Sequence, residues 1–247
     1  MGGALLLRPG EATRLAERVR GARAPGSHGA RHPRPGGGVP VSGPPAGRAV
    51  ALIGTGSELD RAIAVACAEA GTDIALGTVD RSQEQDFGMN SIANELWAIG
   101  REHFVRVMDA TEATEAASFA DEACDRLGRC DALVASHELF AAVELDELSP
   151  DEWERSLRVN LTGPFLAGQA FGRLMERQGS GTIVFVTVER PGGDAAWTAA
   201  KAGLDGLADH IGRAWGEAGV SACVVRVAAD DPPAGARAVL AAITSHD

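Results

Sequence analysis

The sequence predicts an α/β protein built on a doubly wound parallel sheet of about six strands, with helices on both faces. Two observations support this fold class. From residue 49 onward, short apolar runs alternate with segments whose apolar residues recur at helical spacing. The apolar runs are nearly continuous, as in parallel strands that are buried on both faces. In such a fold the ligand crevice lies at the carboxyl ends of the strands.

Each predicted strand is a short apolar run between polar or turn-forming segments. In chain order the six strands are expected at 49–54 (AVALIG), 73–79 (DIALGTV), 103–108 (HFVRVM), 131–136 (DALVAS), 182–188 (TIVFVTV) and 221–227 (SACVVRV). Helical spacing between and after them predicts helices at roughly 58–70, 89–100, 112–127, 150–177, 195–217 and 234–245.

The first 48 residues differ in composition from the rest of the chain. They carry eight arginines against two glutamates, 11 of the 31 glycines and 7 of the 12 prolines. Such a segment buries too little apolar surface to order itself, so we predict a disordered tail over 1–48 and one folded domain over 49–247. A linker, a leader peptide and a basic tail that binds a partner or an anion are alternative interpretations of this tail.

Charge and composition exclude several classes of function. The net charge is −11, and the tail contributes +6, so residues 49–247 carry −17 and would repel nucleic acid and anionic lipid. The apolar runs are too short to cross a bilayer. We expect no metal site and a reducing, cytoplasmic location, because the four cysteines are scattered without paired motifs (Cys67, Cys124, Cys130, Cys223).

Two counts bear directly on mechanism. The chain has no tyrosine, and Lys201 is its only lysine beside 22 arginines. Any mechanism that needs a tyrosine hydroxyl is therefore excluded. Retention of one lysine in an arginine-rich composition indicates a need for its ammonium geometry, or a structural role in an ion pair or helix cap.

Several stretches follow one another as in a known family. ALIGTGSELDRAIAVACAEAG is followed by GRCDALVASHE, WERSLRVNLTGPF, GSGTIVFVTVE and WTAAKAGLDGLADHIGRAWGEAGVSACVVRV. Over about residues 49–245 the chain resembles the short-chain dehydrogenases/reductases, as a divergent member. The resemblance implies a Rossmann-like fold, a nicotinamide dinucleotide cofactor and a dimer paired through the helices at 150–177 and 195–217.

The resemblance places the family's phosphate-binding pattern TGxxxGxG on Ile53 to Asp60. Gly54 is retained, whereas the second and third glycines fall on Glu58 and Asp60, and Gly56 could replace one of them after a shift in register. Carboxylates here suit the helix dipole but repel a diphosphate. We therefore expect an acid-capped helix and no cofactor, with NAD or NADP as the alternative if the site still functions.

Two interpretations are open for the residues that correspond to the adenosine end of the family's cofactor site. The positions that distinguish NAD from NADP fall on Thr78 and Val79, with Asp80 and Arg81 just beyond. Asp109 matches an acidic position that contacts adenine in the family, and it is equally an ordinary signal for the start of a helix.

The family's NNAG motif corresponds to Ala135, Ser136, His137 and Glu138. His137 and Glu138 could do acid–base work as a pair, because a carboxylate can orient an imidazole and raise its pKa. A pair of solvent-facing loop residues is the alternative, and we favour it.

The resemblance assigns the catalytic positions of the family to Asn160, Val188, Trp197 and Lys201. Asn160 and Lys201 match, whereas Val188 replaces the serine and Trp197 replaces the tyrosine. Thr187 is expected on the opposite face of the strand from Val188. An indole N–H donates a hydrogen bond but does not titrate usefully. The usual machinery for hydride transfer is therefore absent.

The end of the chain also departs from the family pattern. Val227 leads through Ala228 and Ala229 directly into DDPP, where the family has a Pro-Gly pair and a substrate lid. The segment Asp230–Pro233 then joins a short helix at Gly235–Thr244. We therefore expect the lid and the C-terminal strand to be truncated.

Three hypotheses follow, and we favour the first. It is a non-catalytic binding or regulatory subunit that forms a homodimer or a heteromer with an active relative. The sequence identifies no substrate or small-molecule ligand for it. The second is a non-redox acid–base enzyme that uses His137, Glu138, Asn160, Glu189 and Lys201. The third is an NAD(P)-dependent oxidoreductase with an unconventional proton donor.

Overall fold

Six parallel strands form a single sheet, and their bounds follow the predicted apolar runs closely. The computed structural model describes residues 47–245. The strands are β1 (Ala49–Gly54), β2 (Asp73–Thr78), β3 (His103–Arg106), β4 (Ala132–Ser136), β5 (Gly181–Glu189) and β6 (Val220–Ala228). They lie in the order β3-β2-β1-β4-β5-β6, and every neighbouring pair is parallel. The predicted doubly wound sheet is confirmed.

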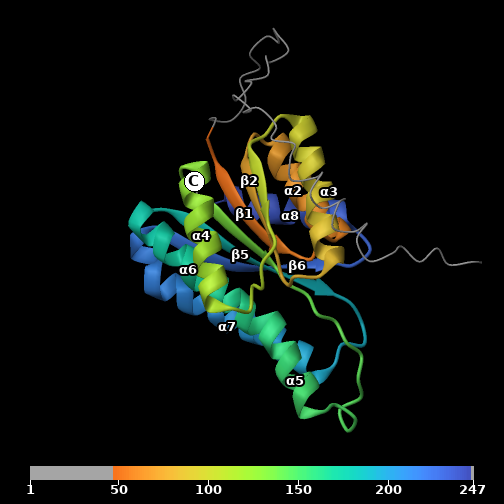
Figure 1. Cartoon of the computed structure of the whole chain (residues 1–247). Coiled ribbons are helices and arrows are strands. Elements are labelled where there is room, and N and C mark those ends of the chain that lie inside the picture. Colours follow the sequence, from red (N-terminus) through yellow and green to blue (C-terminus); the bar gives the residue numbers. More distant parts are fainter. Residues whose placement is uncertain (1–46, 246–247) are drawn as a thin grey trace, which may run out of the picture. The chain divides into compact units, whose positions relative to one another are not determined.

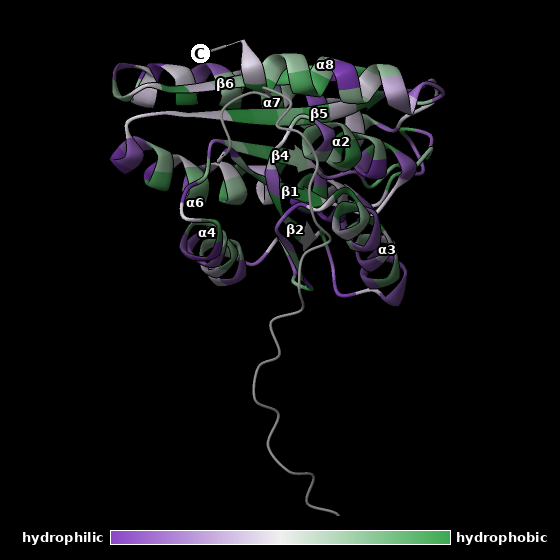
Figure 2. Ribbon diagram, turned by 90° about the horizontal axis from the view of Figure 1, so that it is seen from above, coloured by the Kyte–Doolittle hydropathy of each residue, from purple (hydrophilic) through white to green (hydrophobic). Residues whose placement is uncertain are grey.

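Helices cover both faces of the sheet (Figures 1 and 2). On one face, α2 (Glu58–Glu69), α3 (Gln83–Ile99) and α8 (Pro232–Thr244) pack on Val50 and Leu52 of β1. On the other face, α4 (Ala113–Leu127), α6 (Gly163–Gln178) and α7 (Ala195–Trp215) pack on Ala51 and Ile53. Successive residues of β1 therefore feed two separate cores, which is why its sequence is apolar throughout.

Local sequence signals account for the ends of most helices. Ser57, Ser82 and Ser149 are N-caps whose side chains accept a hydrogen bond from a backbone N–H group in the first turn. Glycines in the left-handed conformation end three helices (Gly100, Gly128, Gly179). The prediction that α3 begins near residue 89 was wrong, because its first turn is polar and its buried face starts only at Met89, apart from Gln85.

The predicted single helix at 150–177 is three consecutive elements. They are α5 (Pro150–Leu157), a π-helical turn η1 (Arg158–Thr162) and α6. A π-helical turn inserts an extra residue into the helical ladder, and such turns occur frequently at functional sites. Here the turn contains Asn160, which is buried.

The last elements connect β5 to the end of the described chain. A short 3₁₀ turn η2 (Gly216–Ala218) follows α7 and leads into β6. Helix α8 begins at Pro232, slightly earlier than predicted, and packs against α2 and β6. Among residues 47–245 no strand follows β6, and no helix is long and apolar enough to cross a membrane. Most of the predicted tail, 1–46, lies outside the described residues.

Candidate active site

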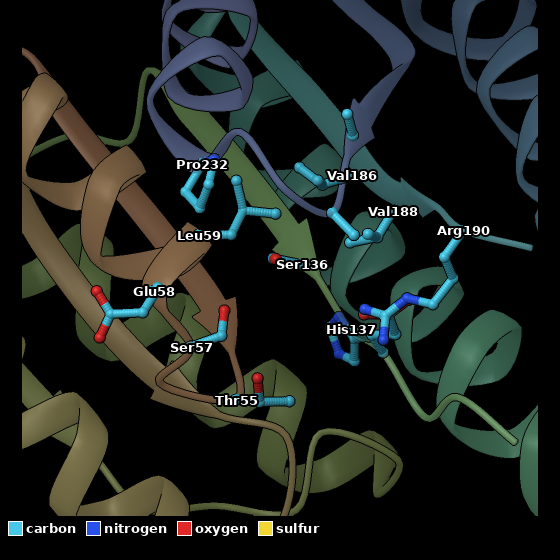
Figure 3. Close-up of a pocket in the computed structure, with 13 residues that line it drawn as sticks. Thr55, Ser57, Glu58, Leu59, Ser136, His137, Val186, Val188, Arg190 and Pro232 are labelled. Atoms are coloured by element: carbon cyan, nitrogen blue, oxygen red, sulfur yellow. The ribbon is translucent and has the colours of Figure 1, made fainter.

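A cavity of about 210 Å³ lies at the carboxyl edge of the sheet, where the loops after β1, β4, β5 and β6 meet (Figure 3). Strands β1 and β4 are neighbours, and the chain runs outward from them in opposite directions. This is the topological switch point at which doubly wound folds bind ligands. The cavity is lined by Thr55, Ser57, Glu58, Leu59, Ser136, His137, Glu138, Val186, Val188, Arg190, Ala228, Ala229 and Pro232.

The β1–α2 loop is organised around the carboxyl group of Asp60. One of its oxygens, Oδ2, accepts hydrogen bonds from the backbone N–H groups of Thr55 and Ser57, each at 3.0 Å, and from Ser57 Oγ at 2.9 Å. A Cβ atom on Gly54 would lie 2.6 Å from the Asp60 carboxyl carbon, so only glycine fits at position 54. Asp60 is completely buried, and burial raises the pKa of its carboxyl group. Hydrogen bonding by the Ser136 hydroxyl and by Thr55 and Ser57 of the loop acts in the opposite direction and lowers this pKa.

Gly56 has a structural role that its place in the sequence does not reveal. It has a φ of 77° and packs against Gly88 of α3, whose Cα would lie 2.9 Å from a Cβ on Gly56. Gly56 is not among the residues that line the cavity. The other acid of the loop, Glu58, is among the lining residues, but its carboxylate is turned away from the other lining side chains (Figure 3). It is exposed and pairs with Arg61.

Asp109 makes local hydrogen bonds after β3. Its carboxylate accepts hydrogen bonds from the N–H group and the hydroxyl of Thr111, at 2.9 and 2.6 Å, and its own N–H group donates to Glu115. Asp109 is not among the residues that line the cavity at the switch point. These contacts stabilise the turn into α4.

His137 is buried and does not pair with its neighbour Glu138. Neither ring nitrogen has a hydrogen-bond partner among the described residues, and the ring packs against Gly163 at the start of α6. Burial lowers the pKa of His137 to about 3, so the imidazole is neutral near pH 7. The structure therefore shows neither a His137–Glu138 pair nor the pair of solvent-facing loop residues that we favoured.

Glu138 is paired with a residue 52 positions away. Its Oε2 atom accepts a hydrogen bond from Arg190 Nη2 at 2.6 Å, and Oε1 is buried without a partner among the described residues. Burial raises the pKa of Glu138, while the Arg190 and Lys201 cations and the Trp197 indole oppose that rise. The guanidinium of Arg190 also lies 4.8 Å from the centre of the Phe140 ring, which fixes its position.

Trp197 and Lys201 stack on one another beside this carboxyl group. The Lys201 ammonium lies 4.0 Å from the centre of the Trp197 ring and donates a hydrogen bond to the Val188 carbonyl at 3.0 Å. Trp197 is 6% exposed and meets Phe140 edge-on, with the ring centres 5.3 Å apart. Burial lowers the pKa of Lys201.

Asn160 connects the π-helical turn to the segment after β4. Its Oδ1 accepts a hydrogen bond from the Leu139 N–H group at 2.7 Å, and its Nδ2 donates to the Leu139 carbonyl at 2.8 Å and to Ser156 Oγ at 3.1 Å. These contacts hold Leu139, the residue after Glu138, against α5 and the π-helical turn. Asn160 therefore positions the candidate site.

Two site residues were missed or misassigned from the sequence. Arg190 faces the cavity, whereas Glu189 is exposed and is not among the lining residues. Alternation along β5 places Val186, Val188 and Arg190 on one face, and this signal could have identified Arg190.

Thr187 is buried with its hydroxyl unpaired among the described residues. Across residues 47–245 no group of three His, Cys, Asp or Glu side chains is suited to hold a metal ion.

Comparisons with known proteins agree on one family. A family model described as short chain dehydrogenase matches residues 48–235. D-threitol dehydrogenase of Mycolicibacterium smegmatis is 31% identical over 178 residues, which are 70% of this chain and 66% of that protein. Cis-4-hydroxycyclohexanecarboxylate dehydrogenase of Sinomonas cyclohexanicum is 29% identical over 206 residues, 79% of this chain and 80% of that protein.

A solved structure extends the likeness to three dimensions. A metagenomic short-chain oxidoreductase in complex with NADP matches with a TM-score of 0.69 and 25% identity, over 81% of this chain and 92% of that chain. The chain spans just under two thirds of the length of the D-threitol dehydrogenase. All three of these proteins are dehydrogenases or oxidoreductases, so the comparisons favour the oxidoreductase hypothesis over the non-catalytic subunit.

Proposed function

Because the chain belongs to the short-chain dehydrogenase family, we propose that it is an oxidoreductase that uses a nicotinamide dinucleotide and takes its proton from Glu138. The observation that carries this proposal is the Glu138 carboxyl group in the cavity at the switch point. A carboxyl group whose pKa is raised keeps its proton closer to neutral pH and can act as a general acid. Trp197, at the position of the family's tyrosine, cannot supply that proton.

Glu138 would exchange one proton with the substrate oxygen. In reduction, Glu138 donates its proton to the oxygen of an aldehyde or ketone as the carbonyl carbon gains a hydride, and the carboxylate left behind regains a proton from water. In oxidation, the Glu138 carboxylate accepts the hydroxyl proton of the alcohol. The nicotinamide, when bound, supplies or accepts the hydride.

Neighbouring cations control the two protonation states of Glu138. Arg190 holds the carboxylate by a hydrogen bond, and both Arg190 and Lys201 stabilise its negative charge after the proton has left. Burial has the opposite effect and favours the protonated form. These opposing effects suit a group that must lose and regain a proton in each turnover.

The cavity suits a dinucleotide in two respects and opposes it in one. The N-terminus of α2, with Ser57 and Leu59, attracts negative charge, and Arg190 supplies a cation at the ends of β4 and β5. These residues would hold the diphosphate and the nicotinamide end respectively. Asp60 is the adverse group, because its carboxyl group already accepts the N–H donors of the loop. The site therefore fits the cofactor, with reduced affinity.

The test measures cofactor binding and turnover separately. Calorimetric titration with NADH and NADPH is combined with turnover assays on aldehydes, ketones and polyols. A four-carbon polyol comes first because D-threitol dehydrogenase is a relative. Glu138→Gln removes the proton but keeps a side-chain oxygen that Arg190 can bind, so the variant should remain folded, leave cofactor binding unchanged and lower kcat by about 100-fold or more. Glu147→Gln, an exposed glutamate in the same connection, is the control. Full turnover by Glu138→Gln would exclude Glu138 as the proton donor.

A binding or regulatory subunit without redox activity is the second candidate. It is favoured by Trp197, which is buried between Phe140 and Lys201 where the family has a titrating tyrosine. Its partner would be a second copy of the chain or a related short-chain dehydrogenase. We propose a cytoplasmic location, with which the four free cysteines agree. Wild-type protein that binds neither cofactor would support this candidate and refute the first.

A further inference from the structure

The loop between β1 and α2 binds an anion that belongs to the chain itself. Two backbone N–H groups and one hydroxyl converge on a single oxygen atom of Asp60 at 2.9 to 3.0 Å. Backbone N–H groups at a strand-to-helix turn are donors with which proteins bind phosphate groups. In this chain a carboxylate oxygen occupies that position.

The rest of the Asp60 side chain fills the space next to the cavity. Its carboxyl carbon lies 2.6 Å from the position that a Cβ on Gly54 would take, so the group packs against the end of β1. The second oxygen, Oδ1, is buried and has no hydrogen-bond partner among the described residues. Thr55 and Ser57, which donate to Oδ2, also line the cavity, so the carboxyl group lies directly behind the cavity wall.

The negative charge of the Asp60 carboxylate affects which ligands the cavity can bind. The Asp60 carboxylate is stabilised by backbone dipoles and hydroxyl groups of the loop, which a phosphate in the cavity would also need. Burial raises the pKa of Asp60, but the donors that converge on Oδ2 oppose this rise and favour the carboxylate. A diphosphate at the N-terminus of α2 would lie close to this carboxylate, whose charge is screened little by solvent because it is buried. Both effects weaken the binding of a diphosphate and leave an uncharged ligand unaffected.

We propose that Asp60 is a specificity-determining residue, which acts as a built-in substitute for phosphate and keeps the affinity for nicotinamide dinucleotides low. This inference rests on the proposed function, because it concerns the cofactor of the same site. It predicts that affinity is regained when the carboxylate is neutralised or removed. It also predicts that the phosphate-free nucleoside adenosine does not respond to the substitution.

The test compares Asp60→Asn and Asp60→Gly with the wild-type chain. Asp60→Asn keeps the shape of the side chain and one acceptor oxygen, so it preserves the loop and removes only the charge. Asp60→Gly also opens the space and loses the cap of α2. Glu69→Gln, an exposed charge change at the other end of α2, is the control. Far-UV circular dichroism and thermal unfolding establish that each variant is folded.

Each protein is titrated calorimetrically with NADH, NADPH and adenosine. We expect Asp60→Asn to lower the Kd for NADH or NADPH by about tenfold or more, with no change for adenosine or in Glu69→Gln. A wild type that binds as tightly as Asp60→Asn would overturn this inference and leave the proposed function intact. Failure of every variant to bind either dinucleotide would refute both. Equal tightening for adenosine would show that Asp60 acts by filling space, and would also overturn the inference.

Discussion

Glu138 pairs with Arg190 and not with His137, because the two consecutive residues lie in different surroundings. The imidazole is buried against Gly163, whereas the Glu138 carboxyl group reaches a guanidinium from the end of β5. Burial therefore has opposite consequences for the two groups. It lowers the pKa of His137 and raises the pKa of Glu138, and in both cases it favours the neutral form.

His137 should make the protein sensitive to acid. Its pKa is about 3 in the folded chain and 6.5, the ordinary value for histidine, in the unfolded chain, so the unfolded state binds more protons between these values. Stability is therefore fully present above about pH 6.5 and falls as the pH decreases toward 3, by an amount on the order of a few kcal/mol. Urea unfolding at a series of pH values measures this loss.

The matched variants for that measurement are His137→Leu and His103→Leu. Leucine cannot take up a proton, and neither ring nitrogen of His137 has a partner to lose among the described residues. His137→Leu should flatten the pH dependence, whereas substitution of the partly exposed His103 should not. An unchanged slope in His137→Leu would show that other groups cause the acid sensitivity.

The Trp197 ring leaves no space for a side chain at position 193, so this residue is glycine. A Cβ atom at position 193 would lie 2.0 Å from Cε3 of Trp197, and the ring is held between Phe140 and Lys201. We expect Gly193→Ala to destabilise the fold by about 1–3 kcal/mol through overpacking, measured by chemical unfolding. Adding Trp197→Leu should recover part of this loss, and no recovery would locate the strain elsewhere.

At the scale of the elements, the π-helical turn η1 fixes the segment that carries Glu138. Asn160→Ala removes the buried amide that binds both backbone groups of Leu139, so we expect a loss of about 1–3 kcal/mol. The Leu139 amide should also exchange its hydrogen faster, which hydrogen–deuterium exchange measures directly. Unchanged protection at Leu139 would contradict the role assigned to Asn160.

Sequence patterns predicted the strands better than the helices. Strands β1, β2 and β4 are buried on both faces, so the apolar run of each marks both of its ends. Helix α3 starts with the polar turn of Gln83 to Asp86, which has no apolar periodicity, and its start was therefore missed. The π-helical turn was missed because it changes backbone hydrogen bonding without any change of residue type that the pattern could show.

At the scale of the whole molecule, helices α6 and α7 present an apolar groove. It is lined by Phe165, Gln169, Leu207, His210, Ile211, Ala214 and Trp215, and Phe165 is 41% exposed. The predicted homodimer would bury this surface. Phe165→Glu should therefore give a monomer by light scattering, whereas Phe87→Glu, on the exposed side of α3, should leave the assembly unchanged. A monomeric wild type would refute the dimer.

The candidate site was only partly predictable because it is assembled from distant parts of the chain. The family pattern directed attention to Gly54, Asn160, Trp197 and Lys201, and none of these four is among the residues that line the cavity. The contact of Glu138 with Arg190 joins the ends of two strands and depends on the register of the sheet. The burial of Asp60 was missed for a different reason. At the start of a helix an acid normally faces solvent, and here a glycine beside it admits the carboxyl group into the interior.

The single lysine also gives the protein a chemical handle. Lys201 is the only side-chain primary amine of the chain, and it rests on the Trp197 ring beside the cavity. Because its pKa is lowered by burial, a larger share of this amine is unprotonated and nucleophilic than in an ordinary lysine. A succinimidyl ester would therefore acylate one side chain, which donates a hydrogen bond to the carbonyl of the cavity-lining residue Val188. A reporter dye attached there would respond to whatever enters the cavity.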